Sequence, residues 1–134
     1  MRRTLAACLS LLIYLAASGA ALSDPPHSRS ARERLTGRIC DLISAEAART
    51  GLPRDFLARL IWKESRFDPN AVSPAGAEGI AQFMPGTARL RGLADPFDIA
   101  EAIAASAAYL AEMRAGYGNL GLAAAAYNAG EARV

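Results

Sequence analysis

Apolar residues recur at helical spacing in several separate stretches of the chain. The first stretch carries Leu35, Ile39, Leu42 and Ile43 and ends before Gly51. Side chains three and four positions apart fall on one face of an α-helix, so this stretch predicts a helix with one buried face. No stretch shows a sustained alternation of apolar and polar residues, the pattern of a half-buried strand. The sequence therefore predicts an all-α fold.

Turn-forming residues divide the rest of the chain into further predicted helices. Pro53 suits the first turn of a second helix, whose apolar pattern ends at Asp68-Pro69. A loop with prolines and glycines is predicted over 70–79, followed by one short helix that begins near Pro85. The architecture expected so far is a bundle of short helices with one long Gly/Pro-containing loop.

Two more helices are predicted towards the end of the chain. Asp98 and Glu101 have the spacing of a capping box at a helix start, and glycines at 116 and 118 supply stop signals. An Ala-rich helix is predicted over 120–129. The residues expected on the buried face of the longer helix are Ile99, Ile103, Ala107, Leu110 and Met113.

The first residues have the pattern of a secretory signal peptide. Two arginines follow the initial methionine, and an uncharged stretch then covers 4–23. Its Leu- and Ala-rich core ends in small residues, which favours cleavage after Ala20 or Ser23. The alternative is a retained membrane anchor, because about twenty uncharged residues approach the length of a bilayer span. The sequence predicts a signal peptide over 1–23 and a periplasmic or cell-envelope location.

Composition and charge narrow the possible functions of the remaining chain. A polar linker is predicted over 24–34 and a single domain over 35–134. The 15 Lys and Arg residues include two in the signal peptide, so 13 basic residues face 13 acidic ones after cleavage. This balance argues against nucleic-acid binding, which needs an excess of basic residues. With one His and two Cys in the whole sequence, we expect no metal site, and Cys40 is expected to be a small buried thiol.

Glu64 interrupts the apolar pattern of the second predicted helix. It lies seven residues after Leu57, four after Leu60 and three after Ile61, which places its carboxylate on the apolar side. Burial raises the pKa of a carboxyl group and keeps it protonated near neutral pH, as a general acid requires. The alternative is a helix-end carboxylate that turns to solvent or pairs with a neighbouring cation.

Several motifs resemble the soluble lytic transglycosylase domain of bacteria. The run over 64–88 reads ESRFDPNAVSPAGAEGIAQFMPGTA, the Tyr109-Leu110 pair fits the same pattern, and AYNAG follows at 126–130. The motifs occur in the order and spacing of the family, and the resemblance extends from about Gly51 to the end of the chain. Together they are far more specific than any one short match.

The resemblance implies a lysozyme-like α fold and cleavage of the β-1,4 bond between N-acetylmuramic acid and N-acetylglucosamine in peptidoglycan. In the family the glutamate of the Glu-Ser motif is the single catalytic carboxylate, which implies this role for Glu64. Tyr127 is expected to hydrogen-bond near Glu64, and Gln82 to offer a donor and an acceptor to an acetamido group. The residues implied to line the sugar cleft are Ser73, Gln82, Met84, Tyr127 and Asn128.

The same resemblance implies a reaction without metal, cofactor or water, in which Glu64 acts first as acid and then as base. The muramic acid 6-hydroxyl then attacks C1, and the product carries a 1,6-anhydro end. The implied partners are peptidoglycan strands and a growth or envelope-spanning secretion complex, with no stable membrane insertion after signal cleavage.

Two other functions remain open. A hydrolase of goose-type-lysozyme character would need a second carboxylate, for which Glu78 is the candidate. The second open function is that of a non-catalytic peptidoglycan-binding domain. The sequence stops at Val134, four residues after Gly130, whereas family domains usually continue with further helices. We therefore expect a C-terminally truncated domain or a minimal form with an open cleft.

Overall fold

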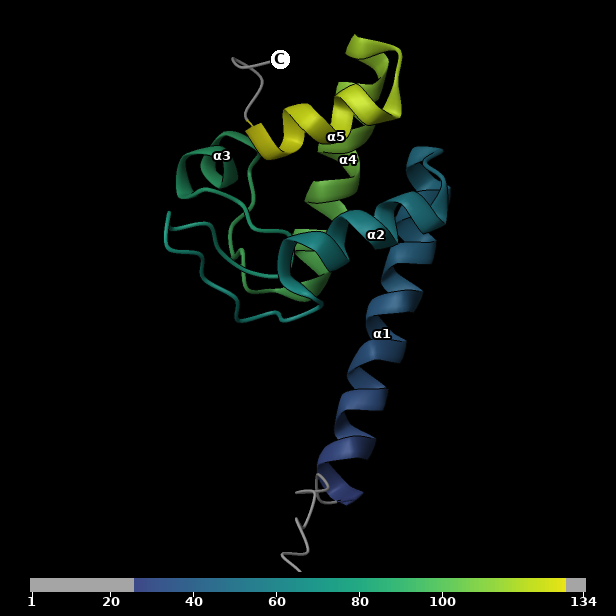
Figure 1. The fold of residues 1–134 in the computed structure, drawn as a ribbon, viewed down its shortest axis with the longest axis vertical. Coiled ribbons are helices and arrows are strands. Elements are labelled where there is room, and N and C mark those ends of the chain that lie inside the picture. The colour runs from purple at the N-terminus through teal and green to yellow at the C-terminus, as the bar shows by residue number, and fades with distance from the viewer. Residues whose placement is uncertain (1–25, 130–134) are drawn as a thin grey trace, which may run out of the picture.

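The computed structural model describes residues 26–129, and this part of the chain is all-α, as the sequence predicts (Figure 1). The predicted signal peptide over 1–23 lies outside the described residues. Between 26 and 129 the only β-type pairings are isolated bridges. None of the helices described combines the length and the apolar character needed to cross a bilayer. The helices are α1 (Pro26–Thr50), α2 (Arg54–Ser65), α3 (Pro85–Leu90), α4 (Ile99–Tyr117) and α5 (Leu120–Ala129).

Helix α1 begins earlier than the sequence predicts. The expected polar linker over 24–34 is helical from Pro26 onward, so this part of the prediction is wrong. Proline is tolerated in a first helical turn, and the Ala, Arg and Glu residues over 31–34 are good helix formers. This end of α1 projects away from the other helices, and 31–34 are exposed (Figure 1). A helix that buries no face shows no apolar periodicity, which explains why the pattern missed it.

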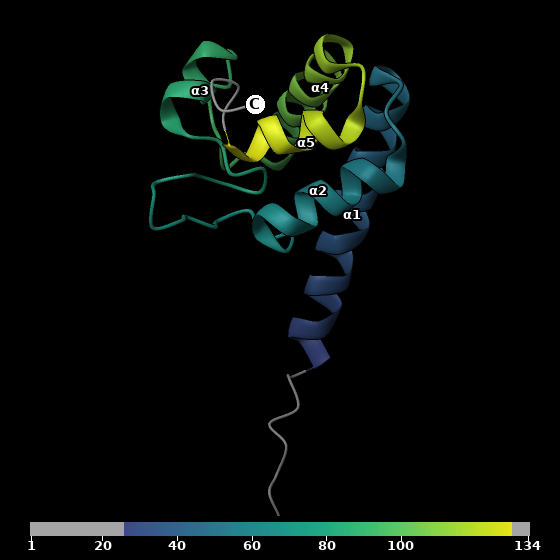
Figure 2. The same cartoon turned by 45° about the horizontal axis from the view of Figure 1, so that its top comes forward.

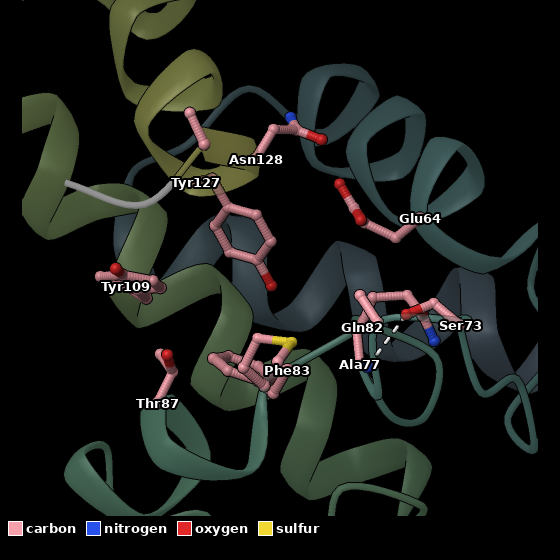
Figure 3. Close-up of a pocket in the computed structure, with 12 residues that line it drawn as sticks. Glu64, Ser73, Ala77, Gln82, Phe83, Thr87, Tyr109, Tyr127 and Asn128 are labelled. Carbon is pink, nitrogen blue, oxygen red and sulfur yellow. Dashed lines mark hydrogen bonds between the residues drawn. The ribbon is translucent and has the colours of Figure 1, made fainter. Parts of the chain in front are cut away.

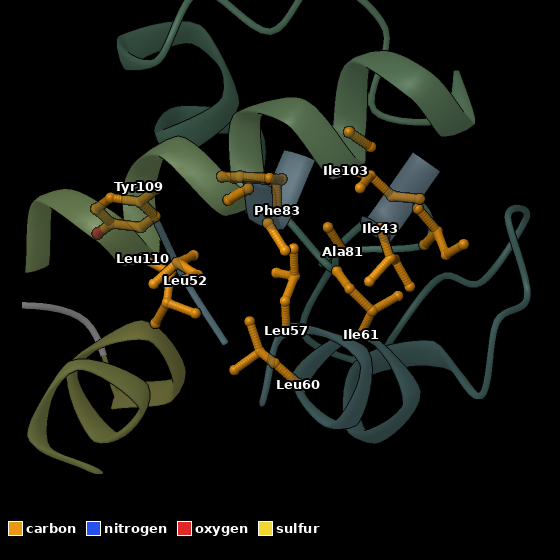
Figure 4. Close-up of a cluster of buried hydrophobic side chains, with 14 of the residues drawn as sticks. Ile43, Leu52, Leu57, Leu60, Ile61, Ala81, Phe83, Ile103, Tyr109 and Leu110 are labelled. Carbon is orange, nitrogen blue, oxygen red and sulfur yellow. The ribbon is translucent and has the colours of Figure 1, made fainter. Parts of the chain in front are cut away.

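The core forms where α1, α2 and α4 meet, and α5 packs on α4 (Figures 1 and 2). The apolar faces predicted from the spacing point into it, and each fully buried Leu or Ile contributes about 1.5–3 kcal/mol of hydrophobic free energy. Figure 4 shows side chains from α1, α2, α4 and the loop before α3 meeting in one cluster. The fully buried large residues are Ile39, Ile43, Leu57, Ile61, Ile80, Ile103 and Leu110.

Helix α2 ends at Ser65, three residues before the predicted stop at Asp68. Arg66 and Phe67 both adopt left-handed backbone conformations, with φ of 55° and 65°. The Arg66 amide donates to the Trp62 carbonyl oxygen, which closes the helix end. The chain then turns sharply away from α2 into the long loop, so that Glu64 lies where the helix meets the loop.

The loop over 66–84 is fixed by its own backbone hydrogen bonds. Glu78 forms isolated bridges with Val72 and Phe83, and the Gly79 amide donates to the Ala71 carbonyl oxygen at 2.9 Å. Gly79 has a φ of +73° and packs directly against the backbone of Pro96, before α4. This contact joins the loop to the helical core.

The predicted caps of α4 are present. The Asp98 side chain accepts a hydrogen bond from the Glu101 amide at 2.8 Å. The reciprocal bond of a capping box differs, because Glu101 accepts from the Asp95 amide instead of the Asp98 amide. At the other end Gly118 adopts a φ of 67° and closes the helix, and α5 begins two residues later. This short connection lays α5 back across α4, towards the end of α2 (Figure 2).

Candidate active site

Glu64 lies in the last turn of α2 and is partly buried. Its Oε1 atom is inaccessible to solvent and has no hydrogen-bond partner in the described part of the protein. Desolvation raises the pKa of this carboxyl group above its ordinary value of 4.5, and the positive charge of Lys63 partly opposes the shift. The prediction that the carboxylate lies on the apolar side of α2 is confirmed. A neutral carboxylic acid is the form that this environment favours.

The Glu64 carboxyl opens into a cavity of about 370 Å³ between α2, the loop and α5 (Figure 3). In Figure 3 the carboxylate points from α2 towards α5, which carries Tyr127 and Asn128. All six residues that the sequence singled out line this one cavity, although they come from separate segments. The lining residues are Glu64, Ser73, Ala75, Ala77, Gln82, Phe83, Met84, Thr87, Tyr109, Tyr127, Asn128 and Ala129.

Ser73 and Gln82 build the loop wall of the cavity. The Ser73 hydroxyl accepts a hydrogen bond from the Ala77 amide at 3.0 Å. The Gln82 amide nitrogen donates to the carbonyl oxygens of Ala71 and Gly79, at 3.1 and 2.9 Å. Both side-chain N–H groups of Gln82 are therefore used within the loop, which leaves its oxygen to a ligand. The expectation that Gln82 offers a donor as well as an acceptor is corrected in this respect.

Tyr127 bonds to the cavity wall instead of to Glu64. Its hydroxyl donates to the Ala81 carbonyl oxygen at 3.0 Å and lies 3.1 Å from the Ser106 hydroxyl oxygen. A phenol has one proton to donate, so the fully buried Ser106 donates to Tyr127. Burial is the main cause that raises the pKa of Tyr127, and the nearby Glu64 charge adds to it. Tyr127 is thus close to Glu64 and neutral, but the structure gives no hydrogen bond between them.

Met84 and Asn128 lie at the mouth of the cavity. Met84 precedes α3 as its N-cap residue and is 45% exposed. Asn128 donates one N–H to the Ala124 carbonyl oxygen one turn earlier in α5, at 2.8 Å. No other hydrogen bond joins this side chain to a described residue, which leaves its carbonyl oxygen and second N–H for a ligand. Both residues can therefore contact a ligand without loss of a core contact.

The aromatic floor of the cavity includes Tyr109, which was not selected as a site residue. Tyr109 stacks on Phe83, with ring centroids 6.3 Å apart, and lies 5.5 Å from the Tyr127 ring. The Arg91 guanidinium lies over the Tyr109 ring, with its central carbon 3.8 Å from the ring centroid. The Tyr109-Leu110 pair was part of the resemblance, and this was the signal that could have identified it. Phe83 is buried and belongs to the hydrophobic core.

Thr87 and three alanines also line the cavity without a distinct signal in the sequence. Thr87 lies in the first turn of α3. Ala75, Ala77 and Ala129 carry no functional group, and only the closed loop and the end of α5 bring them to the cavity.

No second carboxylate lines the cavity in the part of the chain that the structure describes. Glu78 is held by backbone bridges on the loop, and Asp68 accepts a hydrogen bond from the Asn70 amide at 2.9 Å. Asp68 therefore caps the turn after α2. Glu78, the candidate second carboxylate of a hydrolase, does not line the cavity.

Residues 26–129 contain no group of three His, Cys, Asp or Glu residues arranged to hold a metal ion. Cys40 is a free thiol on α1 and is partly exposed, so the prediction of a small buried thiol is wrong. It lies one residue after Ile39, which takes the buried position on that turn of the helix.

A solved structure of a larger protein has a similar arrangement of helices over most of this chain. The lytic transglycosylase Slt of Pseudomonas aeruginosa, crystallised as an inactive glutamate-to-glutamine mutant, is similar with a TM-score of 0.65 and 34% identity. The match covers 69% of this chain and 17% of that one. The all-α arrangement around one pocket-lining carboxylate is therefore a lysozyme-like fold.

The family model of the transglycosylase SLT domain matches residues 41–134. The chain belongs to this family. It is 40% identical over 77 residues to the membrane-bound lytic murein transglycosylase F of Desulfosudis oleivorans, which covers 58% of this chain and 17% of the relative. A transglycosylase of Enterobacteria phage PRD1 is 33% identical over 90 residues, which covers 67% of this chain and 34% of the phage protein. The chain thus spans about a third or less of the length of these relatives.

Proposed function

We propose that this protein is a peptidoglycan lytic transglycosylase that cleaves the β-1,4 bond between N-acetylmuramic acid and N-acetylglucosamine. Glu64 acts as the single general acid and base. The observation that carries this proposal is the Glu64 Oε1 atom, buried and without a partner beside a cavity. A buried polar atom without a partner is costly and rare in folded proteins, so its retention calls for a functional reason.

The raised pKa of Glu64 suits the first step. Burial favours the protonated acid, which can donate its proton to the glycosidic oxygen as the bond from that oxygen to C1 breaks. The 2-acetamido group of the muramic acid stabilises the positive charge that develops at C1. The protein then needs no nucleophile of its own, which agrees with a described cavity lined by one carboxylate.

The second step returns the proton to Glu64. The Glu64 carboxylate removes the proton of the 6-hydroxyl of the same muramic acid, and this oxygen forms the new bond to C1. The product is a 1,6-anhydro sugar, no water is consumed, and Glu64 is protonated again for the next cycle. A nucleophile within the same sugar has a high effective concentration, which favours this outcome over attack by water.

The other cavity residues suit a substrate of N-acetylated sugars. The free oxygen of Gln82 can accept from an acetamido N–H, and the exposed Met84 offers an apolar surface to a sugar ring. Ser73 supports the loop, and Tyr127 supports the wall next to Glu64 through Ala81 and Ser106. We assign Asn128 a contact at the mouth of the cavity, where its side chain is exposed.

Comparison with the relatives supports the same activity. The similar proteins carry the names lytic murein transglycosylase and transglycosylase, and the solved Slt structure is an inactive mutant in which a glutamine replaces a glutamate. We further propose export through the signal peptide over 1–23 to the cell envelope, where this substrate lies, and service to a growth or secretion complex there.

Mass spectrometry of the products released from purified sacculi tests the proposal. The wild-type protein should release muropeptides with 1,6-anhydro ends, and Glu64→Gln should release none. Glu78→Gln is the matched control, because it removes a carboxylate of the loop after α2 that does not line the cavity. It should keep the wild-type products.

Two results would contradict the proposal in different ways. If the wild-type protein releases reducing ends in place of anhydro ends, and Glu78→Gln releases no products, the protein is a hydrolase with two carboxylates. No products from either the wild-type protein or Glu64→Gln, with equal binding of both to sacculi, would identify a non-catalytic binding domain.

A further inference from the structure

A buried hydroxyl group lies behind the wall of the candidate active site. Ser106 is fully buried in α4 and does not itself line the Glu64 cavity. A serine inside a helix commonly returns its hydroxyl to a backbone carbonyl one turn earlier. The Ser106 hydroxyl instead bonds to the Tyr127 hydroxyl of α5, at 3.1 Å. The bond therefore joins two helices and does more than satisfy a buried polar group.

Tyr127 extends this connection to the loop before α3. Figure 3 shows its ring reaching from α5 towards the loop side of the cavity, and its hydroxyl donates to the Ala81 carbonyl oxygen at 3.0 Å. Hydrogen bonds in a row polarise one another, so the bond that Ser106 donates strengthens the bond that Tyr127 donates. We call these two hydrogen bonds the Ser106–Tyr127–Ala81 chain.

The Ser106–Tyr127–Ala81 chain ends on the peptide group that precedes Gln82. Gln82 has a left-handed backbone conformation, with a φ of 53°. Such a conformation is uncommon for a residue with a Cβ, and it persists where the surrounding structure holds it. The carbonyl carbon of Ala81 is one of the four atoms that define this φ. A hydrogen bond to the Ala81 carbonyl oxygen therefore restrains the backbone rotation of Gln82.

The backbone conformation of Gln82 sets the position of its side chain. The side-chain N–H groups donate to the Ala71 and Gly79 carbonyl oxygens, and the backbone amide donates to Gly79 at 3.2 Å. A change in φ would move these donors together. The side-chain oxygen, which these bonds leave for a ligand in the cavity, would move with them.

We propose that Ser106 is a positioning residue, which acts through Tyr127 and Ala81 to hold Gln82 in the conformation that binds an N-acetylated sugar. This inference rests on the proposed function, since it needs the acetamido group of a substrate at Gln82. Ser106 does not line the cavity and Tyr127 gives its one proton to Ala81. The effect of Ser106 therefore falls on substrate binding and not on proton transfer by Glu64.

Hydrogen exchange of the Gln82 backbone amide tests the connection without any need for activity, because exchange reports local opening. Ser106→Ala should make this amide exchange about two- to fivefold faster, since the bond from Tyr127 to Ala81 weakens. Tyr127→Phe removes both bonds and should give a larger increase, up to about tenfold. The double variant should exchange no faster than Tyr127→Phe, because Ser106 acts through Tyr127.

Ser44→Ala is the matched control. Ser44 is a helical serine whose hydroxyl is also hydrogen-bonded, to the Cys40 carbonyl oxygen at 2.7 Å, and it does not line the cavity. This variant should leave exchange at Gln82 unchanged. If Ser106→Ala speeds exchange equally throughout the core, with no excess at Gln82, Ser106 has a purely structural role and the inference is overturned.

Kinetics on glycan strands test the consequence for the substrate. Ser106→Ala should raise KM by about two- to fivefold and leave kcat and its pH profile unchanged, the pattern of a loss in binding. In a Gln82→Ala background the same substitution should have no further effect on KM, because the side chain that Ser106 positions is absent.

Two kinetic results would overturn the inference. A shifted pH profile in Ser106→Ala would show that Ser106 acts on Glu64, and an undiminished rise in KM in the Gln82→Ala background would show that it does not act through Gln82. If the wild-type protein cleaves no strands, the proposed function fails instead. The exchange rates of Ser106→Ala, Tyr127→Phe and the double variant then still decide whether Ser106 holds Gln82.

Discussion

Replacing Gly79 by alanine should disrupt the contact that joins the loop to the helical core. An added Cβ would lie 1.8 Å from the Pro96 carbonyl oxygen and 2.7 Å from its carbonyl carbon, distances that real atoms do not reach. The backbone of Gly79, at a φ of +73°, adds the strain of a left-handed conformation, about 1–2 kcal/mol for a residue with a Cβ. Relief of the clash needs a backbone shift, which costs about 1–3 kcal/mol more.

The expected loss for Gly79→Ala is therefore about 2–5 kcal/mol, a large part of the 5–15 kcal/mol typical of folded domains. Gly76→Ala is the matched control, because Gly76 has a φ of +86° in the same loop but no atom within 4 Å of an added Cβ. It should lose only the backbone part, about 1–2 kcal/mol. The free energy of unfolding is measured from urea titrations followed by circular dichroism. Equal losses in the two variants would refute the argument that the contact with Pro96 holds the loop.

Three further changes have expected outcomes. Asp98→Ala removes the side chain that caps α4 and should lower the free energy of unfolding by about 1 kcal/mol. Asp55→Ala is the control, because Asp55 caps no helix. An unchanged free energy of unfolding in Asp98→Ala would contradict the cap. Ser106→Ala removes the fully buried hydroxyl bonded to Tyr127 and should cost about 0.5–1.5 kcal/mol in the same titration, and an unchanged value would show that this bond is not formed. Glu64→Gln should be more stable than wild type at pH 7 and no more stable at pH 3, as measured by thermal unfolding, because the folded-state pKa is raised above 4.5. Below pH 4.5 Glu64 is protonated in both the folded and the unfolded state. Above pH 4.5 the unfolded state ionises first, so the stability of the wild-type protein falls until the pH passes the folded-state pKa. A stability difference between the two proteins that is constant across pH would contradict the burial of Glu64.

The parts of the fold that follow from local spacing could be predicted from the sequence. The last helix was expected over 120–129 and is found there, and the predicted buried face of α4 is buried, with Ile99 at its edge. The side of α2 on which Glu64 lies follows from its distance to Leu57, Leu60 and Ile61. Each of these features depends on the spacing of residues within one helix.

The parts that depend on distant segments could not be predicted. Gln82 gives its N–H groups to Ala71 and Gly79 because the loop closes on itself, and no local pattern reports that closure. Tyr127 bonds to Ser106 and Ala81, 21 and 46 residues away, and so does not bond to Glu64. The start of α1 was missed for a different reason, because an exposed helix has no buried face to produce a pattern.

The most direct test of the account is a titration of the Glu64 side-chain carboxyl carbon by nuclear magnetic resonance. The signal is assigned by its absence in Glu64→Gln, and its chemical shift is followed as pH rises. Burial beside the cavity predicts a midpoint above the ordinary value of 4.5, so that a proton is held for donation at a higher pH than on an exposed glutamate. A midpoint at or below 4.5 would show that the carboxyl is solvated or paired in solution, and would contradict its assignment as the general acid.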